Sequence, residues 1–223
     1  MSLSSKTIAV VGGGSVGSTL ANALQGKAKT VVIAARNPEK TKVQLTEKGL
    51  DLPVELVAPA ISSADILILA TPSVYSDVAL QDLAQSLGDV SGKVVIDATN
   101  PLTEFAEGLQ VRWAQGTSGG EVLQESLPSA YVYKAFNTVG VEHMADPSGK
   151  DMLFCGSPDQ KELVQAVVAA VGFKPYYVGP IRYARNLEAM AELWIHCAIP
   201  PLPAANFGRD WTFGISGNPT SSS

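Results

Sequence analysis

Histidine and cysteine are scarce in this chain, which has two of each among its 223 residues. His143 and His196 lie in no catalytic spacing, and neither H-E-x-x-H nor C-x-x-C occurs. Cys155 and Cys197 fall in apolar segments, which fits reduced thiols better than a disulfide framework. We therefore expect no metal site and no side chain that acts as a catalytic acid or base.

An excess of positive charge and long hydrophobic runs are also missing. The chain has 16 Lys and Arg against 21 Asp and Glu, which argues against sequence-independent binding to nucleic acid or to an anionic membrane. No apolar run approaches the roughly 20 residues of a membrane-spanning helix, and the opening MSLSSK is too short and polar for a signal peptide. The sequence predicts a cytoplasmic protein without nucleic-acid or membrane partners.

Short apolar runs rich in β-branched residues alternate with helix-like stretches from Lys6 to about Gly179. The runs are KTIAVV, TVVIAA, PVELV, DILILA, KVVIDA, AYVYKA, DMLFCG and PYYVG. Continuous hydrophobicity is typical of parallel strands that helices cover on both faces. Helical spacing occurs at 15–25, 38–48, 75–87 and 158–171. This alternation predicts an α/β fold with a doubly wound, mostly parallel sheet.

The pattern changes after Gly179, where residues 183–199 form an amphipathic helical stretch. Its apolar stripe comprises Leu187, Met190, Ala191, Trp194, Ile195 and Ala198. The stripe either caps the sheet or packs against its copy in a second subunit, and the pattern favours neither. Glu188, Glu192 and His196 lie on one face, which we interpret as solvated rather than as a metal site. We predict a domain at 1–179, with a C-terminal helix and closing loop at 180–223 in the same compact unit.

A glycine-rich loop follows the first expected strand. VVGGGSVG supplies Gly12, Gly14 and Gly17 in G-x-G-x-x-G spacing where a helix begins, which is the context of a Rossmann dinucleotide-binding loop. The three glycines permit a tight turn, close approach of a pyrophosphate, and close helix packing, and the helix N-terminus faces the negative charge. We expect this loop, with Ser15 and Val16, to bind the cofactor.

The end of the second expected strand selects the type of dinucleotide. NAD-specific sites place a carboxylate there to accept hydrogen bonds from the ribose, but this chain has Ala35 and then Arg36. The planar guanidinium of Arg36 suits a 2′-phosphate, which predicts NADP(H), and Asn37 and Lys40 are further candidates for this site. The alternative is a purely structural arginine.

Two later turns lie at the carboxyl ends of expected central strands, where ligands of open α/β sheets bind. We expect Thr71, Pro72 and Ser73 to lie alongside the nicotinamide ribose. Thr99, Asn100 and Pro101 are placed to border the nicotinamide ring. The alternative is that both are ordinary strand-to-helix turns.

The lack of an acid and a base bears on the reaction. Reduction of a carbonyl requires proton delivery to an alkoxide, whereas a flavin-type ring takes up the electrons itself, so the protein mainly holds two rings in contact. Lys134 is the one candidate base, and at a strand end it is also interpretable as neutralising a phosphate.

The chain resembles the coenzyme F420-dependent NADP oxidoreductases and the cytoplasmic reductase domain of the six-transmembrane epithelial antigen ferric reductases. The resemblance rests on six ordered motifs: VGGGSVGSTLA, VVIAARNPEK, ILILATPSVY, VVIDATNPL, TSGGEVLQESLPSAYVYKAFNTVG and VGPIRYARNLEAMAELWIH. It implies a Rossmann domain with a small C-terminal helical appendage, a homodimer, and hydride transfer between NADP(H) and a deazaflavin or flavin. It also implies that Ala135, Phe136 and Asn137 line the ring-stacking cleft, although Phe136 is equally interpretable as core.

The closing loop departs from the archaeal pattern, because it is longer and carries Phe207, Trp211 and Phe213. The small-molecule acceptor therefore stays open among coenzyme F420, FMN and FAD. Two other functions remain. One is a small-molecule dehydrogenase or imine reductase, although such enzymes generally carry a larger helical substrate domain than the segment after Gly179 provides. The other is a non-catalytic NADP(H)-binding sensor.

Overall fold

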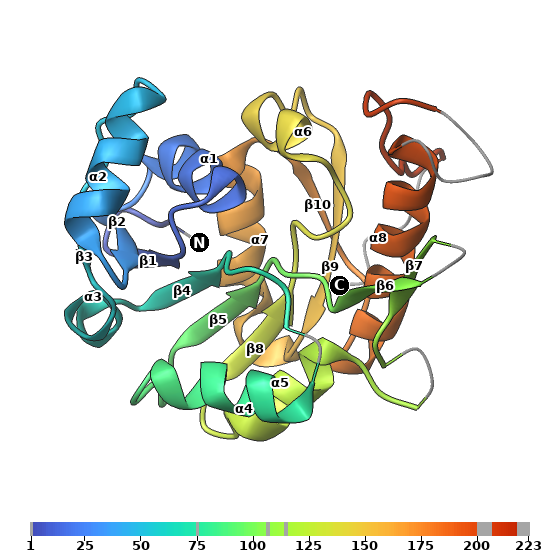
Figure 1. The fold of residues 1–223 in the computed structure, drawn as a ribbon, viewed down its shortest axis with the longest axis horizontal. Helices are drawn as coiled ribbons and strands as arrows, with labels where there is room; N and C mark the ends of the chain where they lie inside the picture. The colour runs from blue at the N-terminus through green and yellow to red at the C-terminus, as the bar shows by residue number, and fades with distance from the viewer. Residues whose placement is uncertain (1, 75, 106–107, 114–115, 200–206, 218–223) are drawn as a thin grey trace.

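A sheet of eight strands, in the order β10-β9-β8-β5-β4-β1-β2-β3, forms the centre of the structure (Figure 1). The computed structural model describes residues 2–74, 76–105, 108–113, 116–199 and 207–217. The strands are β1 (Thr7–Val11), β2 (Thr30–Ala35), β3 (Val54–Leu56), β4 (Ile66–Leu69), β5 (Val94–Asp97), β8 (Tyr131–Lys134), β9 (Asp151–Gly156) and β10 (Lys174–Tyr177). Six run parallel, and β9 and β10 run the other way because β9 pairs antiparallel with β8. This confirms the predicted doubly wound, mostly parallel sheet.

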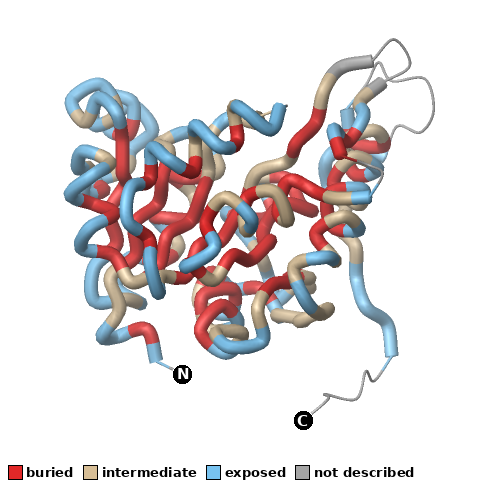
Figure 2. The backbone as a smooth tube through the Cα atoms, turned by 90° about the horizontal axis from the view of Figure 1, so that it is seen from below, coloured by how far each residue is buried: buried red, intermediate tan, exposed pale blue. Residues whose placement is uncertain are grey.

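Helices cover both faces of this sheet. One face packs against α1 (Ser15–Leu24), α6 (Val141–Ala145) and α7 (Lys161–Val171). The other packs against α3 (Val57–Ser63), α4 (Asp77–Ser86) and α5 (Gly119–Ser126). Figure 2 shows the central strands buried between these layers, as their continuous hydrophobicity predicts. The amphipathic α2 (Pro38–Glu47) lies beside β2 and β3 and buries only Leu45.

Several elements differ from the sequence prediction. The run PVELV is a strand only to Leu56, and Val57 begins α3. An antiparallel hairpin, β6 (Leu102–Phe105) and β7 (Gly108–Val111), follows β5 and was not predicted. Its strands pair only with each other, so they lack the uninterrupted apolar pattern of the central strands. Tyr75, which begins one predicted helix, and residues 200–206 and 218–223 of the predicted closing loop lie outside the described residues.

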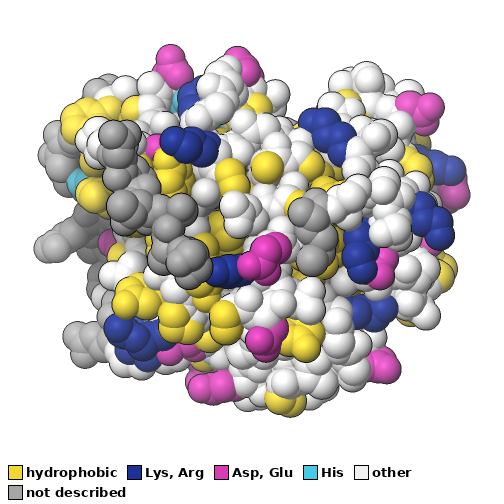
Figure 3. Space-filling view, turned by 180° about the vertical axis from the view of Figure 1, so that it is seen from behind, with side chains coloured by type: hydrophobic (Ala, Val, Ile, Leu, Met, Phe, Trp, Pro, Cys, Tyr) yellow, Lys and Arg dark blue, Asp and Glu magenta, His cyan; other side chains and the backbone are white. Residues whose placement is uncertain are grey.

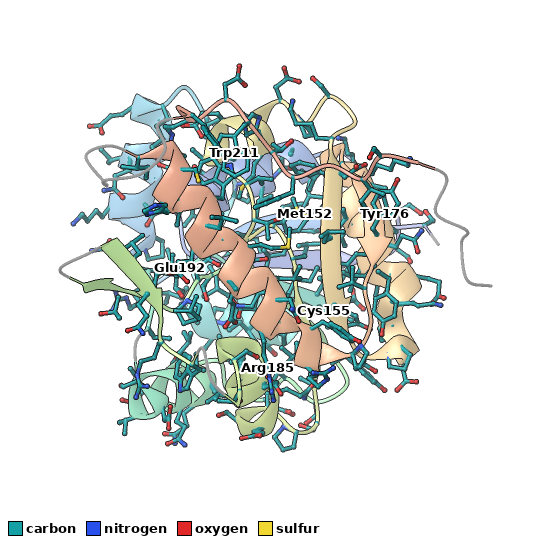
Figure 4. The ribbon with its side chains drawn as sticks, turned by 90° about the vertical axis from the view of Figure 1, so that its right-hand side faces the viewer. Met152, Cys155, Tyr176, Arg185, Glu192 and Trp211 are labelled. Carbon is teal, nitrogen blue, oxygen red and sulfur yellow. The ribbon has the colours of Figure 1, made fainter. Side chains whose placement is uncertain are left out.

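The short helix η1 (Pro158–Gln160) precedes α7, and the short helix η2 (Ile181–Tyr183) leads into the C-terminal helix α8 (Ala184–Ala198). Its stripe faces the rest of the same chain, because Leu187, Ala191, Trp194 and Ala198 are buried. The helix packs against β7, α5 and β9. Figure 4 looks onto α8, which begins beside α5 at Arg185 and passes near Trp211 at its other end. The stripe thus does cap this edge of the protein.

Within the described ranges, no helix is long and apolar enough to cross a membrane. On the face shown in Figure 3, basic and acidic side chains are interspersed with apolar ones instead of forming one charged patch.

Candidate functional site

The glycine loop turns sharply between β1 and α1, next to the end of β4. Gly12 has a φ of +112°, and an added Cβ there would lie 2.6 Å from the carbonyl oxygen of Ala70. An added Cβ on Gly17 would lie 2.0 Å from the carbonyl oxygen of Gly12. At Gly14, by contrast, a Cβ would meet nothing within 4 Å. Gly12 and Gly17 thus allow close packing, while Gly14 borders open space.

That open space lies at the N-terminus of α1. Gly14 is the N-cap residue, and no side chain caps the helix. Ser15 is exposed and Val16 packs partly against the core, so the first backbone N–H groups face outward without a capping acceptor. An uncapped helix N-terminus carries partial positive charge and binds phosphate groups. The loop therefore fits the pyrophosphate of a dinucleotide.

Arg36 follows the last residue of β2 and is exposed. Among the described residues, its guanidinium makes no hydrogen bond or ion pair that would give it a structural role. The side chain of Asn37 caps α2 by accepting a hydrogen bond of 3.0 Å from the backbone N–H of Lys40. This cap occupies the amide oxygen of Asn37, whereas the Lys40 side chain is exposed. Arg36 and Lys40 thus present the two cations at this end of β2.

The turn after β4 has a buried polar atom without a partner. Thr71 and Ser73 are half-buried and Pro72 is exposed. The Thr71 hydroxyl oxygen is buried and has no hydrogen-bond partner in the described part of the chain. The backbone nitrogen of Thr71 lies next to Gly12, so this residue adjoins the glycine loop. A buried hydroxyl without a partner is unfavourable, which indicates that a ligand completes its hydrogen bonding.

The turns after β5 and β8 are joined by two amide side chains. Asn100 Nδ2 donates to the carbonyl oxygen of Asn137 at 3.0 Å, and Asn137 Nδ2 donates to Asn100 Oδ1 at 3.1 Å. Asn137 Nδ2 also donates to the carbonyl oxygen of Leu187 in α8, at 2.9 Å. Asn137 is 4% exposed, and its Oδ1 has no partner among the described groups. This is a second acceptor at the carboxyl end of the sheet that a ligand can satisfy.

Three other predicted residues of these turns are buried. Phe136 is fully buried, with its ring 6.2 Å from that of Phe173, and its φ of +66° is unusual for a bulky residue. Ala135 is also fully buried, and its N–H donates to the carbonyl oxygen of Asp97. Pro101 is buried against the start of α5. These residues shape the backbone of the turns, and the strained turn at Phe136 places Asn137 beside Asn100.

The two histidines lie away from these turns. His143 is buried in α6, where its Nε2 faces the carbonyl oxygen of Arg209. His196 lies in the last turn of α8. No group of three or more His, Cys, Asp or Glu side chains suited to a metal ion occurs among the described residues.

The comparisons with known proteins agree with this geometry. The model of the family described as "NADP oxidoreductase coenzyme F420-dependent" matches residues 7–101, from β1 to Pro101. The resemblance inferred from the sequence is thereby confirmed, and the match covers the dinucleotide-binding part of this chain.

The similarity to one curated protein extends beyond residue 101. Metalloreductase STEAP3 of Rattus norvegicus is 30% identical over 188 residues, which cover 82% of this chain and 36% of the rat protein. Glutamyl-tRNA reductase of Methanococcus maripaludis is 33% identical over 101 residues, which cover 44% of this chain and 25% of that protein. The chain thus spans about a third or less of the length of these curated relatives.

Solved structures show the same fold. A candidate F420-dependent NADP reductase from Arthrobacter sp. FB24 is 28% identical, with a TM-score of 0.70 over 84% of this chain and 91% of that chain. An imine reductase from Aspergillus terreus is 18% identical, with a TM-score of 0.59 over 84% of this chain and 59% of that chain. The second likeness concerns the fold alone.

Two charged residues lie in surroundings that differ from the interpretation of the sequence. Lys134 is fully buried and pairs with Asp97 at 2.6 Å and with Glu188 at 2.9 Å, so the interpretation as a phosphate-neutralising side chain is wrong. Burial would lower the pKa of Lys134, but the two carboxylates outweigh it and the pKa lies above its usual value. Glu188 is 0% exposed, so its assignment to a solvated face is also wrong.

The buried thiol of Cys155 is expected to lower the stability of the protein at alkaline pH. Burial raises the pKa of Cys155 from 9.0 to about 12. Between these values the unfolded chain loses the thiol proton and the folded chain keeps it, so stability falls as pH rises, by up to about 1.4 kcal/mol per pH unit. We expect the urea-unfolding free energy of Cys155→Ala to fall less steeply above about pH 9 than that of the wild type. Equal slopes in the two proteins would contradict this assignment.

Proposed function

We propose that this protein is an NADP(H)-dependent oxidoreductase that transfers a hydride between nicotinamide and a deazaflavin or flavin ring. The observation that carries the proposal is the pair of buried, unpartnered acceptors, Thr71 Oγ1 and Asn137 Oδ1. They lie beyond the ends of β4 and β8, which only β5 separates, so these strand ends are about 10 Å apart. A ligand that spans the sheet edge with hydroxyl and amide donors would satisfy both.

Different residues on this edge would bind different parts of the cofactor. Gly12, Gly14 and Gly17, with the N-terminus of α1, would hold the pyrophosphate. Arg36 would bind the 2′-phosphate through a charge-assisted pair of hydrogen bonds. Thr71 would accept from the nicotinamide ribose and Asn137 Oδ1 from the carboxamide. When bound, NADPH supplies the hydride, and the residues of the chain hold and orient the nicotinamide and the acceptor ring.

A flavin-type acceptor fits a chain that provides orientation rather than proton transfer. In our proposal no side chain acts as acid or base, because the acceptor ring itself takes up the electrons. The two turns hold the rings in contact and exclude water. The Ala135 N–H already donates to the carbonyl oxygen of Asp97. Backbone N–H groups that stabilise charge on the reduced ring would therefore come from residues 136–138.

Coenzyme F420, FMN and FAD are the proposed acceptors, and the family's description supports the first of them. The imine-reductase alternative is less favoured, because this chain covers 59% of the imine reductase structure. The NADP(H)-binding sensor is the second candidate, because the cofactor loop alone is compatible with it.

We also propose a homodimer through the C-terminal helix, as the resemblance implies. The outward side of α8 exposes Leu193 at 51%, and Ile199 follows the helix at 39% exposure. A cytoplasmic location and the lack of nucleic-acid and membrane partners stay predictions from the charge and hydropathy of the sequence.

A direct test measures the oxidation of NADPH from the decrease in NADPH absorbance. The protein is offered coenzyme F420, FMN, FAD or no acceptor, and each measurement is repeated with NADH. A ferric chelate added with FAD tests the metalloreductase relative's chemistry. We expect turnover with one flavin-like acceptor and a strong preference for NADPH. Tight NADPH binding without turnover of any acceptor would contradict the proposal and favour the sensor.

A further inference from the structure

Three charged side chains meet where solvent does not reach. Asp97 at the end of β5 is 2% exposed, and Lys134 at the end of β8 and Glu188 in α8 are 0% exposed. Lys134 Nζ lies 2.6 Å from Asp97 Oδ2 and 2.9 Å from Glu188 Oε1. Burying charges is unfavourable unless every group is paired, so such a cluster needs a closed set of partners.

Backbone groups complete this set. The N–H groups of Gly119 and Gly120, in the first turn of α5, each donate to one oxygen of Glu188 at 3.0 Å. The first turn of a helix favours a carboxylate, so α5 stabilises the charge of Glu188. Asp97 Oδ1 accepts from the Thr99 N–H at 2.9 Å and from the Thr99 hydroxyl at 2.7 Å. All four carboxylate oxygens of the cluster therefore have partners.

The cluster continues directly into the two turns of the nicotinamide site. Lys134 Nζ donates to the carbonyl oxygen of Thr99 at 3.1 Å, so the backbone just before Asn100 is held from both sides. Asn100 is paired with Asn137, which in turn donates to the carbonyl oxygen of Leu187. Residues 187 and 188 of α8 thus support both turns, one through its backbone and the other through its carboxylate.

We propose that Glu188 is a positioning residue of the nicotinamide site, acting through Lys134 and Asp97 on the turn at Thr99 and Asn100. It fixes where the unpartnered Oδ1 of Asn137 lies, although Glu188 itself touches no ligand. This inference rests on the proposed function, because it assigns the nicotinamide to these turns. The adenine end of the cofactor, at the glycine loop and Arg36, is independent of the cluster.

The rival explanation is that the cluster only stabilises the fold. A stability role would affect both ends of the cofactor alike, whereas a positioning role affects the nicotinamide end alone. The ligand 2′,5′-ADP carries only the adenine end with its 2′-phosphate. Its affinity relative to that of NADPH therefore separates the two explanations.

The test compares Glu188→Gln with the wild type by calorimetric titration with NADPH and with 2′,5′-ADP. Glutamine keeps the shape but replaces one acceptor with a donor that faces a backbone N–H or Lys134. We expect NADPH affinity to fall about tenfold or more, the effect of one lost hydrogen bond, and 2′,5′-ADP affinity to stay within about twofold. Glu192→Gln, on the half-exposed part of the same helix, is the matched control and is expected to change neither affinity.

Thr99→Val supplies a milder variant, because it removes only the hydroxyl bond to Asp97 and leaves the ion cluster in place. It decides the question if Glu188→Gln does not fold, and a smaller selective loss of NADPH affinity is expected. Equal losses for both ligands, or no loss for either, would overturn the positioning role. A wild-type protein that binds 2′,5′-ADP as tightly as NADPH would show that the turns do not hold nicotinamide, which overturns the proposed function as well.

Discussion

The Gly14→Ala variant is expected to fold normally and to lose about tenfold or more in NADPH affinity. A methyl group at Gly14 meets no protein atom within 4 Å, and the φ of −66° suits alanine, so folding stability stays within about 1 kcal/mol of the wild type. The same methyl group occupies the space in which the loop would hold a pyrophosphate. Urea unfolding and titration with NADPH measure the two effects separately.

Gly17→Ala is the matched variant with the opposite expectation. Its Cβ would lie 2.0 Å from the carbonyl oxygen of Gly12, so α1 must move away from the loop. We expect a loss of about 2–4 kcal/mol of unfolding free energy. If Gly14→Ala binds NADPH as the wild type does, the pyrophosphate does not lie at this loop.

Arg36→Ala is expected to weaken NADPH binding by about 1.5–3 kcal/mol, the range of charge-assisted hydrogen bonds, and to leave NADH binding nearly unchanged. The reason is that Arg36 is exposed at the end of β2, with Ala35 in place of a carboxylate that would serve the NAD ribose. Titration of both cofactors against wild type and variant measures the selectivity.

Two companion variants define what Arg36 contributes. Arg36→Lys keeps the charge but loses the planar pair of donors, and an intermediate loss is expected. Lys40→Ala removes the neighbouring exposed cation and is expected to have the smaller effect. Equal losses of NADPH and NADH affinity in Arg36→Ala would mean that Arg36 does not select the 2′-phosphate.

The parts of the fold that the sequence predicts are those set by local pattern. The apolar runs predict the eight strands, and the spacing of Gly12, Gly14 and Gly17 predicts the loop between β1 and α1. Helix α5 also had a local signal, because Ser118 is its N-cap residue and accepts a hydrogen bond from the N–H of Glu121. That signal lay in a stretch with two glycines, which weakens a helical pattern.

The features that the sequence does not predict depend on contacts between distant segments. Helical spacing places Glu188 with Glu192 and His196, but its burial is decided by Lys134 on β8 and by the backbone of α5. The strained turn at Phe136 likewise depends on the packing of its ring against Phe173. No periodicity within one segment encodes such a partnership.

Because α8 contacts both turns, the two halves of the cofactor site are completed at different stages of synthesis. The loop for the adenine end lies between β1 and β2, which precede α8 in the chain and leave the ribosome before it. The partners of Asn137 and Lys134 at Leu187 and Glu188 are synthesised much later. A nascent chain released before α8 would therefore carry a formed loop for one half of its cofactor and an unsupported surface for the other.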